Sequence, residues 1–195
     1  LSLTLEHLES AFYEEGLRRF SNRDFENAGF SSGVRDQLII VGSHESTHVT
    51  ALSGLVAARF GKDHVVPPCE YNFGLSNVQT FVAIAAALEK TGVSAYDGAI
   101  KFVDEDTIKT DAATIATVEG RHSSLLNVLN VDNRGRAVNA IPGAFDTPLG
   151  FRPVLSIAAP FIRSCPFPLP VQPFPALTLG SGSGRIGDDV SLTFS

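Results

Sequence analysis

Glu45-Ser46-Thr47-His48 and Glu119-Gly120-Arg121-His122 are the two stretches of this sequence that decide its fold. Both have the spacing Glu-x-x-His, which on a helix places the carboxylate and the imidazole on one face. With ten glutamates and five histidines in 195 residues, chance alone would give about 0.3 such pairs. Two occurrences therefore indicate two helices that each present a pair of metal ligands.

Two further glutamates, Glu6 and Glu89, precede these motifs in a repeated arrangement. A tyrosine follows each of them seven residues later, Tyr13 after the first and Tyr96 after the second. One glutamate from each of two helices, with one Glu-x-x-His from each of two others, is the ligand set of a dimetal site inside a four-helix bundle. The sequence therefore predicts six metal ligands: Glu6, Glu45, His48, Glu89, Glu119 and His122.

The six residues have different expected roles around two divalent ions. Glu45 and Glu119 bridge the ions, His48 and His122 bind one ion each, and Glu6 and Glu89 are terminal ligands. Iron and manganese both accept this ligation and zinc can replace either, so the residues do not choose the metal. The two tyrosines are either hydrogen-bond donors to the ligands or ordinary core aromatic residues.

The first motif also fits a different kind of site. His44-Glu45-Ser46-Thr47-His48 has the His-Glu-x-x-His spacing of a zinc metalloprotease, in which Glu45 would be the base and Glu70 a third ligand. That interpretation leaves the second Glu-x-x-His, Glu6 and Glu89 unexplained. The dimetal site is therefore favoured, and His44 becomes a neighbour of the ligands.

Apolar periodicity predicts an all-α four-helix bundle within residues 1–135, with helices over residues 2–21, 33–60, 78–102 and 106–130. In the first helix, Glu9 is expected on the solvent side. Residues 22–32 are expected to form a loop, and Ser32 to cap the second helix. Residues 63–77 can run the length of the bundle, because about 15 extended residues reach about 50 Å, whereas a 25-residue helix is about 38 Å long.

The remaining residues, 136–195, differ in composition. Nine of the eleven prolines lie between Pro142 and Pro175, and a glycine-serine run follows at residues 180–184. These residues predict a non-helical tail that wraps the bundle, with short extended pieces at 154–161, 177–179 and 190–194. Cys69 and Cys165 both lie beside prolines in turn-rich segments, and a disulfide between them is favoured over two free thiols.

Composition limits the classes of function. The chain has a formal net charge of −6 and no run of basic residues, which argues against nucleic-acid binding. Its longest apolar run, residues 81–88, is too short to cross a bilayer. Methionine is absent even from position 1. This favours a secreted chain that has lost a leader, although a trimmed chain is the simpler alternative.

The motifs together resemble the ferritin-like domain proteins of the fungal stress-response and plant and bacterial desiccation-related type. The resemblance covers residues 1 to about 130 and rests on four stretches: Leu5-Glu-His-Leu-Glu9 with Phe12-Tyr13, the motif at 44–48, Leu88-Glu89 with Ala95-Tyr96-Asp-Gly-Ala99, and residues 116–122. It implies a secreted ferritin-like four-helix bundle with one long crossover. Related branches include manganese catalases, di-iron oxidases and storage ferritins.

Two functions from different classes follow. The first is a secreted redox protein that uses a di-iron or dimanganese centre on O2 or H2O2 to remove oxidants during stress. The second is a non-catalytic accessory subunit, with a structural or vestigial metal, that binds a larger secreted protein. The zinc protease is the third and weakest hypothesis.

Overall fold

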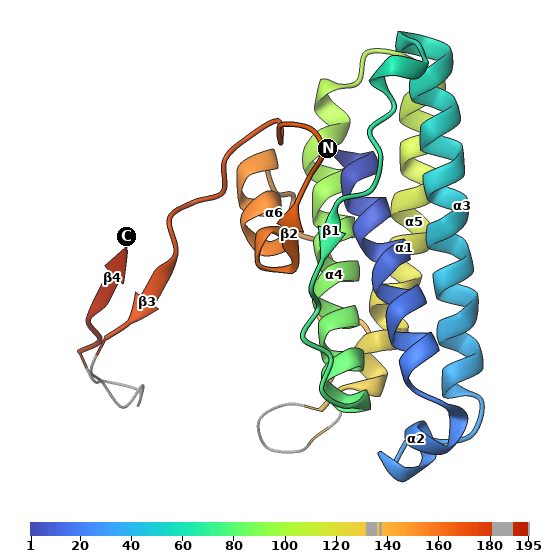
Figure 1. Ribbon diagram of the computed structural model, residues 1–195, viewed down its shortest axis with the longest axis vertical. Coiled ribbons are helices and arrows are strands. Elements are labelled where there is room, and N and C mark those ends of the chain that lie inside the picture. Colours follow the sequence, from blue (N-terminus) through green and yellow to red (C-terminus); the bar gives the residue numbers. More distant parts are fainter. Residues whose placement is uncertain (132–135, 137, 181–188, 195) are drawn as a thin grey trace.

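The computed structural model describes residues 1–131, 136, 138–180 and 189–194. Four long helices lie side by side in Figure 1: α1 (Ser2–Arg19), α3 (Val34–Phe60), α4 (Val78–Ala99) and α5 (Asp106–Leu129). α1 packs along α3, α4 packs along α5, and α1 also contacts α4. The predicted all-α four-helix bundle is confirmed. The predicted boundary at residue 135 and residues 181–184 of the glycine-serine run lie outside the described residues.

A short helix, α2 (Asn22–Asn27), occupies the first part of the loop that was predicted for residues 22–32, and residues 28–32 remain non-helical. Ser21 and Asp24 form a capping box, in which the Asp24 amide donates to Ser21 Oγ (3.3 Å) and the Ser21 amide donates to Asp24 Oδ2 (2.7 Å). Phe25 is buried and anchors the turn to the core. The prediction was wrong for α2 because local capping and one buried ring outweigh the polar composition.

The second long helix begins one residue later than predicted. Its N-cap is Gly33, which has a φ of 92° and makes no side-chain cap, so Ser32 does not serve this role. The helix ends at Phe60, before Gly61, whose φ of 96° and ψ of 156° form a backbone conformation that glycine adopts without a steric cost.

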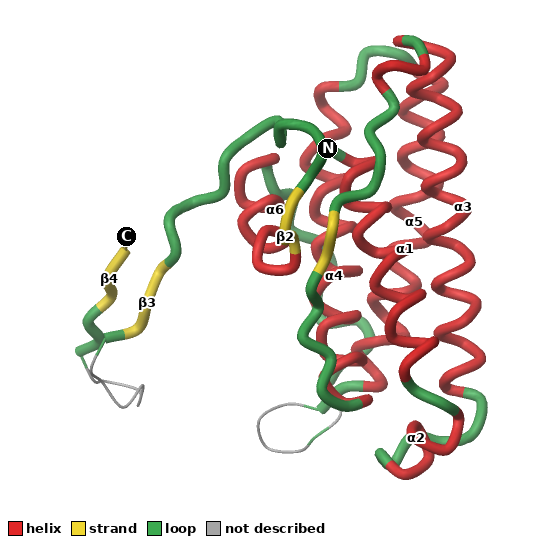
Figure 2. The backbone as a smooth tube through the Cα atoms, viewed as in Figure 1, coloured by secondary structure: helices red, strands yellow, loops and turns green. Residues whose placement is uncertain are grey.

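The crossover joins α3 to α4 along the outside of the bundle (Figure 2). It contains a 3-10 turn, η1 (Lys62–His64), and a short strand, β1 (Glu70–Tyr71). A second 3-10 turn, η2 (Ile100–Phe102), follows α4 and completes the predicted span of that helix. The long connection therefore lies between the second and third bundle helices, as the ferritin-like topology requires.

The tail contains a helix where extended structure was predicted. α6 (Phe151–Ala158) and the 3-10 turn η3 (Ala159–Phe161) occupy the whole of the segment 154–161. Pro153 lies in the first turn of α6, where a missing backbone N–H breaks no helical hydrogen bond. Val154, Leu155 and Ala158 are buried, and α6 packs against α4. Burial of this apolar face explains why proline content did not prevent a helix.

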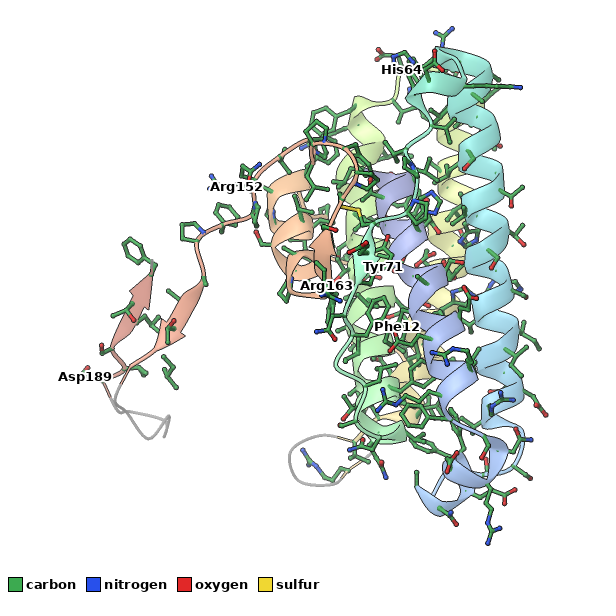
Figure 3. The ribbon with its side chains drawn as sticks, viewed as in Figure 1. Phe12, His64, Tyr71, Arg152, Arg163 and Asp189 are labelled. Atoms are coloured by element: carbon green, nitrogen blue, oxygen red, sulfur yellow. A yellow bond between two sulfur atoms is a disulfide. The ribbon has the colours of Figure 1, made fainter. Side chains whose placement is uncertain are left out.

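The tail is tied to the crossover by a strand pair and a disulfide. β2 (Ile162–Ser164) pairs antiparallel with β1. A disulfide joins Cys69 to Cys165 and appears as the yellow bond in Figure 3. This pairing is the one that the sequence favoured over two free thiols.

The end of the chain departs from the expected wrap. β3 (Leu177–Leu179) and β4 (Leu192–Phe194) form an antiparallel pair, close to the predicted extended pieces. Figure 1 shows these two strands standing away from the four helices, and the residues of both strands are exposed. Earlier parts of the tail do cover the bundle: the Leu149 amide donates to the Ser94 carbonyl oxygen (2.9 Å), and α6 packs against α4.

The core lies mainly between α1 and α4. Phe12, labelled in Figure 3, packs against Tyr13, Phe73 and Phe81. α4 contacts α1, α5 and α6 and buries more than half of its residues. The core therefore holds α1 and α4 firmly together, and this fixes the positions of the polar side chains that they share at mid-bundle.

Candidate metal centre

Each of the four long helices contributes to one buried cluster of carboxylates and imidazoles. The six predicted ligands are at most 8% exposed, and they are Glu6 on α1, Glu45 and His48 on α3, Glu89 on α4, and Glu119 and His122 on α5. The structure brings all six together, as the repeated motif predicts. Their role as ligands stays a prediction.

One half of the cluster surrounds His48. Its Nδ1 lies 3.2 Å from Glu6 Oε2, 3.2 Å from Glu45 Oε2 and 3.4 Å from Glu119 Oε1. In the other half, His122 Nδ1 lies 3.1 Å from Glu45 Oε1 and 3.0 Å from Glu89 Oε2. Both imidazoles therefore present the same nitrogen, Nδ1, to the carboxylates.

The buried oxygen atoms are incompletely satisfied. Among the described residues, Glu45 Oε1 and both oxygens of Glu119 are buried and have no partner with hydrogen-bond geometry. An unpaired buried carboxylate is costly unless it is neutralised or binds a cation. Two groups of four could each hold a metal ion, one with Glu6 and His48 and one with Glu89 and His122, and both contain Glu45 and Glu119. The donor set thus fits metal ions.

The two tyrosines connect the halves crosswise. Tyr13 on α1 donates to Glu89 Oε1 on α4 (2.6 Å), and Tyr96 on α4 donates to Glu6 Oε1 on α1. Both tyrosines are buried. Of the two roles left open by the sequence, the structure therefore favours hydrogen-bond donors, and each bonds the glutamate of the opposite helix.

Burial and mutual repulsion raise the pKa values of some carboxyl groups in the cluster, whereas the two imidazoles lower that of Glu45. Burial, together with the charge of Glu45, raises the pKa of Glu6 to about 7 against the pull of His48. Burial also raises the pKa of Glu119 well above its ordinary value. Glu45 differs, because the adjacent imidazoles of His122 and His48 outweigh its burial and lower its pKa to about 2.

The carboxylates in turn raise the pKa values of both imidazoles. Burial alone would lower the pKa of His48, but Glu119, Glu45 and Glu6 raise it to about 12. Glu45 and Glu89 similarly raise the pKa of His122 to about 9 despite its burial. Protons therefore neutralise the metal-free cluster, and cations that bind there must displace them.

Glu9 is a seventh ionisable member of the cluster and was expected on the solvent side. It is 3% exposed, and no hydrogen bond or ion pair is found for its carboxylate within the described part of the chain. Burial and the charge of Glu119 raise the pKa of Glu9 well above its ordinary value. Its spacing of three from Glu6, which places both on one helical face, was the signal that could have found it.

His44, which the sequence identified only as a neighbour of the predicted ligands, contacts one of them. Its side chain is exposed on α3, yet its Nδ1 lies 2.9 Å from His122 Nε2 and the two rings are stacked. The imidazole of His122 is thus held between the carboxylates on one side and His44 on the other.

The protease arrangement is absent. Glu70 lies on β1, where its carboxylate accepts a hydrogen bond from Ser164. In the described segments, neither His44 nor Glu70 belongs to a group that could hold a metal ion. The His-Glu-x-x-His spacing is therefore incidental to the buried carboxylate and imidazole cluster.

Comparison with known proteins agrees with this geometry. The model of the "Ferritin-like domain" family matches residues 1–131, which include all four long helices and the whole cluster. This chain belongs to the ferritin-like domain family. It is also similar to Protein rds1 of Schizosaccharomyces pombe, with 26% identity over 184 residues.

The match with rds1 covers 93% of this chain but 43% of the fungal protein, so this chain spans less than half of that relative's length. As a ferritin-like domain, the chain has a buried Glu/His cluster that could bind metal. None of the helices in the described residues is long and apolar enough to cross a membrane.

Proposed function

We propose that this ferritin-like protein is a secreted dimetal-carboxylate redox protein that acts on O2 or H2O2 and removes oxidants under stress. The observation that carries the proposal is the sharing of Glu45 and Glu119 by two groups of potential ligands. A carboxylate common to two sites can bridge two ions. Glu6 and His48 would complete one ion's shell, and Glu89 and His122 the other's.

The chain's own residues prepare the site for this chemistry. Tyr13 and Tyr96 fix the outer carboxylates through their hydrogen bonds, which limits rotation of the two terminal ligands. Burial excludes bulk water from the carboxylates. The exposed His44 reaches the otherwise buried His122, which provides a polar contact between solvent and the cluster.

Two bound iron or manganese ions would supply reversible one-electron steps to a small oxidant. The protein's part is to hold the ions, to retain protons on Glu119 and Glu9 when the ions are absent, and to release those protons on binding. The disulfide supports the secreted assignment, because such bonds persist in oxidising compartments.

The test is metal analysis of protein from its native source, followed by assays of O2 and H2O2 consumption. We expect two ions per chain and turnover that disappears after chelation and returns with iron or manganese. Glu14→Ala, at an exposed carboxylate on α1, is the matched control and should keep full turnover. Unchanged turnover after complete metal removal would refute the redox proposal.

One feature favours the second candidate, an accessory subunit that binds a larger secreted protein. Leu177, Leu179, Leu192 and Phe194 on the β3–β4 hairpin are 54% to 78% exposed, and a two-stranded hairpin is marginal without further packing. A native protein that contains no metal, consumes neither oxidant and co-purifies with a secreted partner would favour this candidate.

A further inference from the structure

A cavity of about 240 Å³ lies at the end of the bundle where the start of α1, at Leu1 to Leu3, meets α3, α4 and α5. Leu52, Leu55 and Val56 line it from α3, and Ile108 lines it from α5. These four side chains are partly buried rather than closed into the core. The cavity is distinct from the carboxylate cluster, whose ligands do not line it.

A single side chain connects the cavity to the cluster. Tyr96 lines the cavity, and its hydroxyl donates to Glu6 Oε1. Glu6 in turn lies 3.2 Å from His48 Nδ1. A molecule in the cavity would therefore lie against a residue that orients one of the proposed metal ligands.

The size of the cavity and the side chains that line it limit which molecules can bind there. The volume exceeds the roughly 150 Å³ of an apolar cavity that holds benzene and is below the roughly 300 Å³ of the smallest drug-sized pockets. Among the described residues that line the cavity, Asp111, on the exposed side, is the only one with an acidic side chain, and none has a basic side chain. Burial of a charged group there would lack compensation.

We propose that this cavity binds a small neutral apolar molecule, of the size of one aromatic ring or a short aliphatic chain, next to the dimetal centre. One part of this inference rests on the proposed function, namely that the bound molecule is an organic substrate of the dimetal centre. The binding itself requires no metal. The driving force is removal of the leucine, valine and isoleucine surfaces from water.

The test measures binding of two probes, toluene and 1-octanol, to the full chain without metal, by calorimetry and saturation-transfer NMR. Ala112 lines the cavity from α5, so Ala112→Leu should fill it and weaken binding by at least about tenfold, equivalent to about 1.4 kcal/mol. Ala51→Leu, at an exposed position on α3, is the matched control and should bind as the wild type does.

A second variant shows whether weaker binding comes from the filled cavity or from misfolding of the first variant. Val56→Phe fills the same cavity from α3 and should also weaken probe binding. The proposal would be overturned if the wild-type protein bound neither probe. This would be the result if residues before Leu1 in a longer chain, or a second copy of the chain, already filled the cavity. Equal affinity of both filled variants and the wild type would overturn it as well.

Manganese-loaded protein separates this inference from the proposed function. Bound probe protons should then show faster relaxation than in zinc-loaded protein, because the paramagnetic ions lie one residue beyond the cavity wall. Unchanged relaxation would overturn the placement beside the centre. Probe binding with the expected relaxation, but without O2 or H2O2 consumption, would refute the redox function and leave the cavity's ligand class intact.

Discussion

Five carboxyl groups and two imidazoles lie buried at the middle of the bundle: Glu6, Glu9, Glu45, Glu89, Glu119, His48 and His122. The carboxyl groups outnumber the imidazoles, so two imidazolium charges cannot neutralise the cluster. Protons held on Glu119 and Glu9, whose pKa values burial raises, reduce the remaining charge. Divalent ions would do so more completely, since each replaces two protons.

Metal stoichiometry should distinguish bridging from terminal ligands. We expect Glu119→Ala or Glu45→Ala to remove both ions, because a bridging carboxylate serves each of them. His48→Ala or His122→Ala should mainly remove one. Elemental analysis of the four purified variants measures this. Retention of two ions by either glutamate variant would exclude the bridging role.

His44 should affect the centre through His122. An Nε2–H of His122 that donates to His44 leaves Nδ1 free to bind an ion, so loss of His44 removes the group that selects this tautomer. We expect His44→Ala to weaken metal binding by about 10- to 100-fold, in a chelator competition assay, without changing the number of ions. If His44→Ala lost all metal while His122→Ala kept it, the dimetal centre would be abandoned.

The metal-free protein should lose stability as the pH rises. The pKa of Glu6 is raised from 4.5 to about 7, so its stabilising effect is complete below 4.5 and disappears as the pH rises through 7. The pKa of His122 is raised from 6.5 to about 9, so its contribution is complete below 6.5 and disappears as the pH passes 9. We expect the Tm of metal-free protein to fall between about pH 5 and pH 9.

Metal binding should have the opposite pH dependence, because a bound ion displaces the protons of the cluster. Affinity should rise through the same pH range, with proton release measurable by calorimetry in buffers of different ionisation enthalpy. Glu6→Gln, which cannot titrate, should flatten the metal-free Tm between about pH 4.5 and pH 7. A Tm that rises with pH in the metal-free wild type would contradict the assignment.

At the scale of elements, the approach of α4 to α5 depends on Gly92. A Cβ atom there would clash with Glu119 Oε2 and would lie 3.2 Å from Glu9 Oε1. Glycine is unfavourable inside a helix unless a close contact requires it, and α4 contains two, Gly92 and Gly98. Both positions make close contacts, the first with the cluster and the second with the backbone of Leu149.

Gly92→Ala should therefore displace Glu119 and weaken metal binding, even though alanine favours helix. Gly54→Ala, in α3 with open space around it, is the matched control and should raise the free energy of unfolding by about 0.5–1 kcal/mol. Chelator competition and urea unfolding measure the two effects. Equal metal affinity in Gly92→Ala and the wild type would show that the cluster tolerates the added methyl group.

For the whole molecule, the disulfide attaches the tail to the crossover. It closes a loop with a sequence separation of 96, and a loop of roughly 100 residues corresponds to about 4.7 kcal/mol in the chain-entropy model. The double variant Cys69→Ala/Cys165→Ala should lower the free energy of unfolding by up to that amount. It should also increase hydrogen exchange in α6.

Metal content supplies the control for this variant. All six proposed ligands lie on the four long helices, so the double variant should still bind two ions. An unchanged unfolding midpoint, or exchange in α6 equal to that of the wild type, would show that the β1–β2 pair and the packing of α6 hold the tail without the disulfide.

The sequence was sufficient for the four long helices and for the six clustered side chains. Glu-x-x-His and the preceding glutamates specify helix faces, and a helix face depends only on local geometry. The same local rules failed for Glu9, which shares a face with Glu6 but was assigned to solvent by its charge. They also failed for α6, where tertiary burial of Leu155 outweighed the proline content.

Periodicity and ligand spacing, both local properties, by themselves determined the helical bundle and the composition of its polar centre. Tertiary structure alone decided the crosswise hydrogen bonds of Tyr13 and Tyr96, the contact of His44 with His122 and the burial of Glu9. Each of these depends on the relative rotation and separation of packed helices. Those quantities come from packing across the whole core, which no short stretch of sequence encodes.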